Sequence, residues 1–308
     1  MNPVEVGPYE EEIQRAREAG EQLLYYQDAE YPNRLKYCDD QPVLLFYKGN
    51  ANLNAERIIA IVGTRSATGY SKEVIRQFME EIKVYDPLII SGLAYGVDIT
   101  AHEYALEYGL ATVGVMGHGM DRIYPAIHKP VVEEMYHNGG ILTEFLTGSK
   151  PDRENFPKRN RIVAGLSDAV IVVESSMKGG SLITADLAIS YSRDLLAYPG
   201  KANDPFSAGC NWLIKTQKAN MIEEASDLVY HMGWDIVHHN NAQQTILFTD
   251  LNEDEERIIG LLKENTELGV DDISLETKMA VSETTILLLE LEFKGVVRSM
   301  PGKKYTLN

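Results

Sequence analysis

From residue 57 to residue 232 the sequence alternates short apolar runs with stretches of helical periodicity, and this alternation restricts the possible folds more than any other feature. Six runs are apolar throughout and rich in β-branched residues, which is typical of strands buried on both faces. They are RIIAIVG (57–63), PLIISG (87–92), ATVGVMG (111–117), ILTEF (141–145), AVIVVE (169–174) and LLAYPG (195–200). Helical spacing is expected over 70–85, 97–109 and 181–193. The pattern predicts a Rossmann-like, doubly wound α/β domain with a mostly parallel sheet over residues 51–232.

Residues 249–308 predict a second, smaller domain. Helices are expected over 253–264, 270–279 and 282–295, and VVRSMPGKKYTL ends the chain with two short extended segments around Pro301-Gly302. Three helices followed by a hairpin indicate a winged-helix domain. The polar, irregular stretch MGWDIVHHNNAQQT predicts a linker over 233–248. The start of the chain, 1–50, is expected to form a short helical and extended segment.

The composition is that of an ordinary globular chain, with 44% hydrophobic and 24% charged residues. Only Cys38 and Cys210 occur among the 308 residues, which fits a reducing cytoplasm and argues against a disulfide framework. No apolar run reaches the roughly 18 residues needed to span a membrane, and MNPVEVGPYEEE lacks the regions of a signal peptide. We therefore expect a cytoplasmic protein with no membrane partner.

The net charge of −17 at first argues against a nucleic-acid partner, because phosphate binding depends on cations. The excess is concentrated at the two ends of the chain. Residues 1–50 carry 5 cations and 10 anions, and residues 241–308 carry 7 cations and 13 anions. The middle is closer to neutral, so the overall acidity is weak evidence against a local groove that binds anions.

Positive charge gathers in the stretch 150–161. Its five cations are Lys150, Arg153, Lys158, Arg159 and Arg161. Phe156 stands among them, and such a mixture suits a single nucleic-acid strand, because the ring stacks on a base while the cations hold phosphates. A solvated loop with clustered cations is the alternative. Arg159 and Arg161 need not both face a ligand, since one of them can pair with Glu144 or Glu174.

Two glycine-rich turns stand where an expected strand meets an expected helix. GTRSATG (63–69) offers backbone N–H groups and a positive helix end to an anion, and its Arg65 suits phosphate. ESSMKGGSLITADLA (174–188) places glycines at a second helix start, with Ser181 as a candidate N-cap. A plain strand–helix turn and a capped core helix are the alternatives. Ligands of a doubly wound sheet lie at the carboxyl ends of its strands, so both turns and the cationic stretch are expected at one rim.

No conventional active site emerges from the sequence. It has no HExxH pattern, no metal-binding cysteine spacing and no GxSxG nucleophile elbow. His118, in GHGMDRIYP (117–125), is interpreted as incidental, because a lone histidine is more often incidental than catalytic. No catalytic residue, metal or cofactor is therefore predicted.

Taken together, these motifs resemble the DNA-processing protein A (DprA, or Smf) family. The resemblance rests on motifs that occur in the family's order over roughly residues 24–230, namely VGTRSATGY, SGLAYGVDITAH, GGILTEF, NFPKRNRIVAGLSDAVIVVE, KGGSLITADLA, LAYPG and GCNWLI. YPNRLKYCDDQPVLLFYKGN (31–50) is similar to the segment that leads into the family's Rossmann-like domain. LELEFKGVV and PGKKYTL are similar to its C-terminal winged helix.

The resemblance implies a recombination mediator that binds single-stranded DNA and is not an enzyme. Family members protect incoming strands during natural transformation, help to load the RecA recombinase, and dimerise through the Rossmann-like domain. The family's glycine-turn motif maps to residues 63–66 and its FPxRN motif to residues 156–160. The expected strand-binding residues are Gly63, Thr64, Arg65, Ser66, Gly69, Lys150, Phe156, Lys158, Arg159, Asn160, Arg161, Gly179, Gly180 and Ser181.

The expected recognition helix of the winged-helix domain is unusual for a DNA reader. SETTILLLELEFKG carries one cation, Lys294, and three glutamates, Glu283, Glu290 and Glu292. A helix in the major groove needs donors and cations along its exposed face. We therefore expect this domain to contact protein, or the body of its own dimer, although Lys303 and Lys304 leave weak phosphate contact open.

Two other functions compete with strand binding. Phosphoribohydrolases are Rossmann-like enzymes with a glycine-rich phosphate turn, which KGGSLITA resembles loosely, and Glu144 or Glu174 would then act as the catalytic acid. A structural adaptor that works through its acidic ends is the third alternative, but it leaves the cationic stretch unexplained.

Overall fold

The computed structural model describes residues 7–234, 251–265, 267–300 and 304–307. The chain divides into two compact units, Met1–Val237 and His238–Asn308, which we call the body and the C-terminal unit. The linker expected over 233–248 lies outside the described residues from 235 onwards, and its boundaries stay a prediction.

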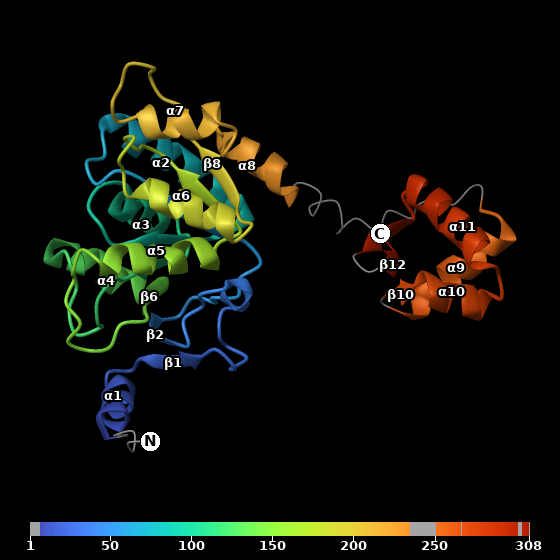
Figure 1. Cartoon of the computed structure of the whole chain (residues 1–308), viewed down its shortest axis with the longest axis horizontal. Coiled ribbons are helices and arrows are strands. Elements are labelled where there is room, and N and C mark those ends of the chain that lie inside the picture. Colours follow the sequence, from blue (N-terminus) through green and yellow to red (C-terminus); the bar gives the residue numbers. More distant parts are fainter. Residues whose placement is uncertain (1–6, 235–250, 266, 301–303, 308) are drawn as a thin grey trace. The chain divides into compact units, whose positions relative to one another are not determined.

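The body is built on one nine-stranded sheet (Figure 1). Its strands are β1 (Gln22–Tyr25), β2 (Leu44–Gly49), β3 (Ile58–Val62), β4 (Leu88–Gly92), β5 (Thr112–Val115), β6 (Gly139–Thr143), β7 (Ala169–Val172), β8 (Asp194–Ala197) and β9 (Asn220–Met221). Their spatial order is β1-β2-β6-β5-β4-β3-β7-β8-β9. Every neighbouring pair from β6 to β9 is parallel, and each of the six expected strands is present. The prediction of a mostly parallel, doubly wound sheet is confirmed.

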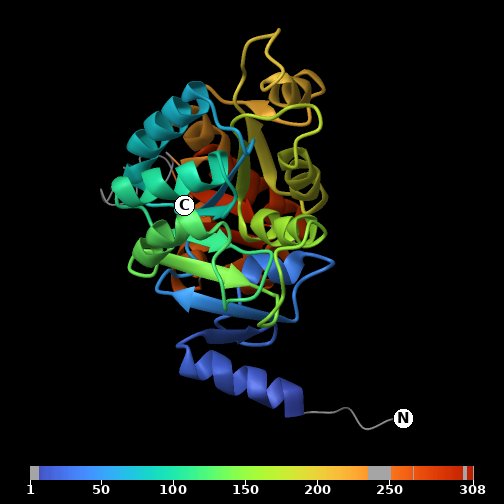
Figure 2. The same ribbon diagram turned by 90° about the vertical axis from the view of Figure 1, so that its left-hand side faces the viewer.

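Helices cover both faces of this sheet. The helices of the body are α1 (Gly7–Glu18), which lies beside the edge strand β1, and α2 (Gly69–Ile82), α3 (Val97–Glu107), α4 (Lys129–Met135), α5 (Asn155–Leu166), α6 (Ser181–Ser190), α7 (Ala208–Lys215) and α8 (Ala225–Met232), with short 3₁₀ turns at η1 (Asn33–Tyr37), η2 (Lys83–Tyr85) and η3 (Ala126–His128). Figure 2 shows the cyan helices α2 and α3 on one side of the sheet and the yellow-green helices α5 and α6 on the other. The three helices expected from periodicity are all present, with α2 continued by η2.

Strand β3 shows why the sheet needs a helical layer on each face. Ile58, Ala60 and Val62 belong to the core cluster that contains α5 and α6. Ile59 and Ile61 belong to the cluster that contains α2 and α3. All five side chains are at most 5% exposed. Full burial of each large aliphatic side chain contributes about 1.5–3 kcal/mol. Because successive side chains of a strand point to opposite faces, all of them can be buried only when both faces are covered.

One region of the body differs from expectation. The pattern predicts no helix between the strands β6 and β7, but the cationic stretch continues into α5, whose Ile162, Val163 and Leu166 are buried against the sheet. The N-terminal segment expected to be helical and extended holds α1, β1 and β2, and its boundary stays a prediction. Strand β2 pairs antiparallel with β6, and β1 pairs antiparallel with β2, so both extend one edge of the sheet.

The strand order creates a crevice at the centre of the sheet. The chain proceeds from β3 through β4, β5 and β6 in one direction, and then returns to the other side of β3 to place β7. Connections that leave β3 and β7 therefore run to opposite faces, and the carboxyl ends of the two strands open a space between them. Such a switch point is where doubly wound sheets bind their ligands.

The C-terminal unit has the predicted winged-helix elements. They are α9 (Glu253–Glu264), β10 (Leu268–Gly269), α10 (Val270–Thr277), α11 (Val281–Phe293), β11 (Val297–Met300) and β12 (Lys304–Leu307). Asn252 begins α9 by accepting hydrogen bonds from the N–H groups of Asp254 and Glu255 at 3.1 and 2.9 Å. The strands form one small sheet in the order β10-β12-β11. The turn expected around Pro301-Gly302 lies outside the described residues.

Candidate nucleic-acid interface

A groove of about 710 Å³ opens at the switch point between β3 and β7. Three segments far apart in the sequence form its walls: the turn after β3, the stretch around the start of α5, and the glycine turn before α6. Gly92, Ala94 and Asp98, from the end of β4 to the start of α3, complete the lining. Nine of the expected strand-binding residues line it, namely Gly63, Thr64, Arg65, Phe156, Arg159, Asn160, Gly179, Gly180 and Ser181. The two glycine turns and the cationic stretch thus meet at one rim, as the sequence predicts.

Five expected residues do not line the groove. They are Ser66, Gly69, Lys150, Lys158 and Arg161. Four of these are exposed, namely Ser66, Gly69, Lys150 and Lys158. Lys158 points to solvent whereas Arg159 lines the groove, because consecutive residues of a helix face different directions. Arg161 is held elsewhere by acidic partners.

Two cations that line the groove are absent from the expected set. Arg153 lies in the cationic stretch just before α5, and Lys178 directly precedes the glycine pair before α6. Both side chains are exposed. Their proximity in sequence to Phe156 and Gly179 is the signal that could have identified them. With Arg65 they give the groove three exposed cations, one from each wall.

Close packing fixes the first glycine turn. A Cβ atom at Gly63 would lie 2.6 Å from Cγ2 of Val97 and 2.9 Å from the carbonyl oxygen of Glu174. The backbone N–H of Thr64 donates to that same carbonyl oxygen at 2.6 Å. Only glycine allows this approach, so the turn after β3 is tied to the end of β7.

The start of α2 is already occupied by a carboxylate. Buried Glu174 accepts hydrogen bonds from the backbone N–H of Thr68 at 3.1 Å and from its hydroxyl at 3.0 Å. Glu174 therefore supplies negative charge where the sequence predicts a bound phosphate. Gly69, the first residue of α2, lies next to this carboxylate, and an anion is better placed farther along the groove.

Arg65 and Phe156 face each other across the groove. The guanidinium carbon of Arg65 lies 5.0 Å from the centroid of the Phe156 ring, which is a cation–π arrangement. Arg65 is exposed and Phe156 is half-buried. The pair joins the turn after β3 to the first turn of α5 and leaves the charge of Arg65 open to a ligand.

Arg159 lies in the floor of the groove, where it is only 5% exposed. Its Nη1 donates to the carbonyl oxygen of Val115 at 3.0 Å, and its Nη2 lies 4.0 Å from the carboxylate of Asp98, in the first turn of α3. Its Nε is buried without a hydrogen-bond partner. Burial lowers the pKa of Arg159 and raises the pKa of Asp98.

Gly92, the last residue of β4, makes room for this buried pair. A Cβ atom there would overlap both the guanidinium of Arg159 and the carboxylate of Asp98. The carbonyl oxygen of Gly92 accepts from Nε2 of His102 at 2.7 Å, and Nδ1 of His102 lies 2.6 Å from the Thr112 hydroxyl. Burial lowers the pKa of His102 to about 4, so the ring is neutral at pH 7.

Arg161 connects helix α5 to the N-terminal edge of the body. Its guanidinium forms an ion pair with Glu144 and donates to the backbone carbonyl of Asp40 at 2.7 Å. The prediction that one of the two arginines pairs with an acid such as Glu144 is confirmed for Arg161. Burial nevertheless raises the pKa of Glu144.

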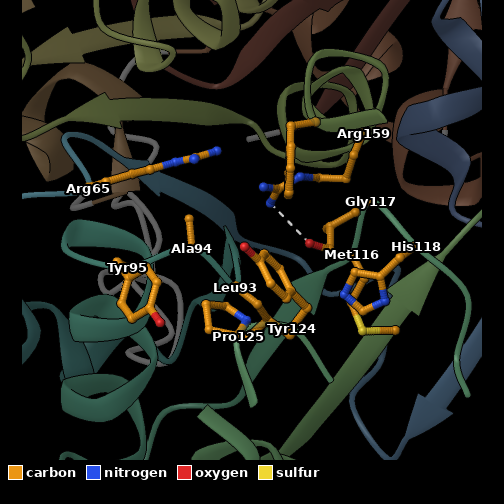
Figure 3. A pocket seen from close by; sticks show the side chains of 12 residues that line it. Arg65, Leu93, Ala94, Tyr95, Met116, Gly117, His118, Tyr124, Pro125 and Arg159 are labelled. Carbon is orange, nitrogen blue, oxygen red and sulfur yellow. Dashed lines mark hydrogen bonds between the residues drawn. The ribbon is translucent and has the colours of Figure 1, made fainter. Parts of the chain in front are cut away.

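A second, smaller cavity of about 80 Å³ adjoins the groove (Figure 3). It shares Arg65, Ala94, Phe156 and Arg159 with the groove and is otherwise mostly aromatic and apolar, with Leu93, Tyr95, Val115, Met116, Gly117, His118, Tyr124 and Pro125. In Figure 3 the Tyr124 ring lies at its centre, between Leu93 and His118. The buried ring of His118 binds the carbonyl oxygen of Gly119 through Nδ1 at 3.0 Å, and burial lowers its pKa.

Within the described ranges, no three His, Cys, Asp or Glu side chains gather as a metal site. No helix in those ranges is both long and apolar enough to cross a membrane.

Comparison with known protein families shows the family to which the chain belongs. A family model described as "DNA recombination-mediator protein A" matches residues 22–233, and one described as "DprA winged helix domain" matches residues 248–303. The chain belongs to the DprA/Smf family. The resemblance in the motifs is thereby confirmed, and so is the winged-helix nature of the C-terminal unit.

Curated DprA/Smf relatives match over most of the chain. Protein Smf of Escherichia coli K12 is 32% identical over 88% of this chain and 74% of its own length. DNA processing protein DprA of Bacillus subtilis 168 is 38% identical over 69% of this chain and 71% of its own length.

Two solved DprA structures share the fold. The X-ray structure of DprA from Streptococcus pneumoniae superposes with a TM-score of 0.68 at 34% identity, covering 74% of this chain and 78% of that one. A structure of DprA from Helicobacter pylori, described as giving insight into a unique single-stranded DNA binding mode, superposes with a TM-score of 0.63 at 32% identity. It covers 70% of this chain and 97% of that one.

Proposed function

We propose that this DprA-family chain binds single-stranded DNA in the groove at the switch point, as a mediator of recombination. The observation that carries the proposal is the meeting of Arg65, Arg153 and Lys178 with the glycine pair Gly179-Gly180 around one 710 Å³ groove. Cations from three separate segments converge there in a chain with a net charge of −17. The single-stranded DNA binding described for the H. pylori relative supports the same ligand.

The groove combines the two features that a single strand requires. Exposed guanidinium and ammonium groups on its walls attract the phosphates, and the glycine turn before α6 lets the backbone of a ligand approach closely. Apart from its own helix backbone and its two neighbours in the chain, no described atom lies within 4 Å of a Cβ atom placed on Gly180, so the wall is open there. The carboxylate of Asp98 is paired with Arg159, so it does not offset the exposed cations on the walls of the groove.

Phe156 is the aromatic group of the site. Arg65 covers one face of its ring, so a base stacks on the remaining face or enters the aromatic cavity beside it. Stacking on an aromatic ring contributes about 1–3 kcal/mol per base and tolerates any sequence, because every base has a π-face. We therefore expect little sequence preference.

Family membership extends the proposal to partners. We infer that the chain protects incoming single strands during natural transformation, helps a RecA-type recombinase to bind them, and forms a homodimer through the body. These roles follow from the resemblance of its motifs to the family. A cytoplasmic site of action fits strand protection after uptake.

The phosphoribohydrolase alternative is not favoured, because both candidate acids are engaged. The carboxylate of Glu174 is held by Thr68, and the carboxylate of Glu144 is held by Arg161. Neither residue lines the groove. We therefore propose a binding function without catalysis.

The test is fluorescence anisotropy of a labelled oligo-dT and of a duplex of equal length, across a salt series. We expect a preference for the single strand and at least about tenfold weaker binding after Arg153→Ala, since one charge-assisted contact is worth about 1.5–3 kcal/mol. Lys158→Ala is the matched control, because Lys158 is exposed but does not line the groove. Absence of binding by the parent protein at low salt would overturn the proposal.

A further inference from the structure

The C-terminal unit presents an apolar stripe on the outer face of α11. Ile286, Leu289 and Phe293 follow one another at helical spacing and are 58%, 51% and 85% exposed. Such spacing places side chains on one face of a helix. We call these three residues the α11 stripe.

The stripe lies opposite the face by which α11 joins its own core. Thr284, Leu288 and Leu291 are buried against the rest of the unit. They are also spaced by four and three residues, but about half a turn away from the stripe. A surface helix normally carries polar residues opposite its buried face. Helix α11 is apolar on both faces, which is typical of a helix that has a second partner.

Carboxylates border the stripe on both sides. Exposed Glu283 and Glu290 lie along one flank, and Glu292 lies on the other, where it accepts from the backbone N–H of Ser299 at 3.0 Å. The cation that follows the helix, Lys294, is paired with buried Glu255 of α9 at 2.7 Å. All the charged side chains that α11 itself places along the stripe are therefore carboxylates.

The sign of this border decides between the possible occupants. DNA and anionic lipid surfaces are repelled by the glutamates. A second copy of α11 would also be repelled, because a symmetric pair of helices, parallel or antiparallel, places Glu283 and Glu290 opposite glutamates of the other copy. A partner helix with an apolar seam and flanking lysines or arginines satisfies both the stripe and its border.

We propose that the α11 stripe is the docking site for an amphipathic, cation-flanked helix of a partner protein. The position is the one that winged-helix proteins use to insert a helix into the major groove of DNA. In this chain the corresponding face carries apolar side chains and carboxylates, and lacks the cations that a helix in the major groove needs. The C-terminal unit thus serves as a protein-recruiting module, independent of the groove in the body.

The probe for this surface is a set of three labelled synthetic helices of equal length. The first has a leucine seam flanked by lysines, the second has the same seam flanked by glutamates, and the third has the lysines but a scrambled seam. Anisotropy with the full-length protein should show saturable binding of the first peptide, and at least about tenfold weaker binding of the other two.

Variants then locate the site. Phe293→Ser and Leu289→Ser should each weaken the lysine-flanked peptide at least about tenfold, as loss of a central apolar anchor does. Glu290→Lys should weaken binding of the lysine-flanked peptide and strengthen binding of the glutamate-flanked peptide. Tyr230→Ser is the matched control, because Tyr230 is an 86% exposed aromatic residue of α8 in the body. Melting curves by circular dichroism should be the same for all variants, since each changed side chain is exposed.

Four results would overturn the proposal. They are equal binding of all three peptides, peptide binding that survives Phe293→Ser, self-association of the parent that Phe293→Ser abolishes, and binding of duplex DNA or of anionic phosphatidylglycerol vesicles that Phe293→Ser abolishes. The last two would assign the stripe to a second copy, to DNA or to a membrane.

Discussion

The guanidinium of Arg159 lies 4.0 Å from the carboxylate of Asp98, and both side chains are almost entirely buried beneath the groove. The pair joins the first half of α5 to the first turn of α3, on opposite faces of the sheet. Gly92 sits between the two helices, at the end of β4, and has no Cβ atom to separate them. The groove is therefore shaped by a buried ion pair, and its open cations are supplied by other residues.

The first prediction concerns the stability of this pair. Arg159→Ala should lower the free energy of unfolding of the body by about 3–5 kcal/mol, because it leaves the buried Asp98 without its counter-charge. Trp212 and Trp234 are the two tryptophans of the chain and both lie in the body, so tryptophan fluorescence during urea unfolding reports on the body alone. The double variant Arg159→Ala/Asp98→Ala should lose less than the sum of the single variants.

Arg76→Ala is the control for that measurement. Arg76 forms exposed ion pairs with Glu73 and Glu80 on α2, and such pairs contribute little to stability because water screens them. A loss after Arg159→Ala as small as that after Arg76→Ala would contradict the role of the buried pair. If Arg159→Ala also weakens DNA binding, loss of the buried ion pair explains that result without a direct contact between Arg159 and DNA.

The second prediction separates binding from folding at Gly180. Its φ of −62° is ordinary, and apart from its chain neighbours and its own helix backbone no described atom would lie within 4 Å of an added Cβ atom. Gly180→Asp should weaken oligo-dT at least about tenfold, since about 1.4 kcal/mol of charge repulsion suffices. Its stability should be equal or slightly higher, because Asp is favoured at the start of a helix. Gly180→Ala is the matched control for the added Cβ atom and should weaken oligo-dT binding less than Gly180→Asp, because it adds no charge. Equal affinity of the Asp variant would place the strand elsewhere.

The sheet of the body could be predicted from sequence because its information is local. A strand such as β3 is apolar at every position, and a run of this kind is stable only between two helical layers. The position of the site could be predicted for the same reason, since glycine turns after strands mark the rim of a doubly wound sheet.

The distinction between Lys158 and Arg159 depends on helix α5, which the pattern does not reveal. Pro157 lies in the first turn of this helix, and a proline is as typical of a turn as of a helix start. The partner that buries Arg159 is Asp98, which lies far away in the sequence. Propensity and spacing carry no information about such a contact, and a charged side chain is buried only when it is paired.

The third prediction concerns stacking on Phe156. Phe156→Ala should weaken oligo-dT roughly tenfold or more, because it removes about 1–3 kcal/mol of stacking and the cation–π contact that orients Arg65. An oligomer of abasic sugar-phosphate units separates these effects, since it offers phosphates without bases. Phe156→Ala should weaken binding of the abasic oligomer much less than binding of oligo-dT. Equal loss for both ligands would show that Phe156 acts only by holding Arg65.

The fourth prediction uses the salt dependence of binding. Each phosphate contact to a single strand contributes about 0.7 to the slope of log K against log salt concentration. Lys178→Ala should lower the magnitude of the slope by about that amount, because Lys178 is an exposed cation of the groove wall. Lys150→Ala should leave the slope unchanged, since Lys150 is exposed but does not line the groove. Equal slopes for the parent and Lys178→Ala would remove Lys178 from the interface.

The last prediction follows from His102 beneath the groove. Burial lowers its pKa from 6.5 to about 4, so below pH 6.5 the unfolded chain binds a proton that the folded chain does not. The free energy of unfolding should therefore fall as the pH falls from 6.5 towards 4, by about 2 kcal/mol between pH 7 and pH 5.

Asp98 acts in the opposite direction in acid, because burial raises its pKa and favours the protonated folded state. The contribution of His102 is thus the difference between the parent and His102→Gln, each unfolded in urea and followed by tryptophan fluorescence. The variant should be less stable at pH 7, where the hydrogen bond to Gly92 is intact in the parent, and its stability should change less between pH 7 and pH 5. Parallel pH profiles for the two proteins would show that His102 is not kept neutral by its burial.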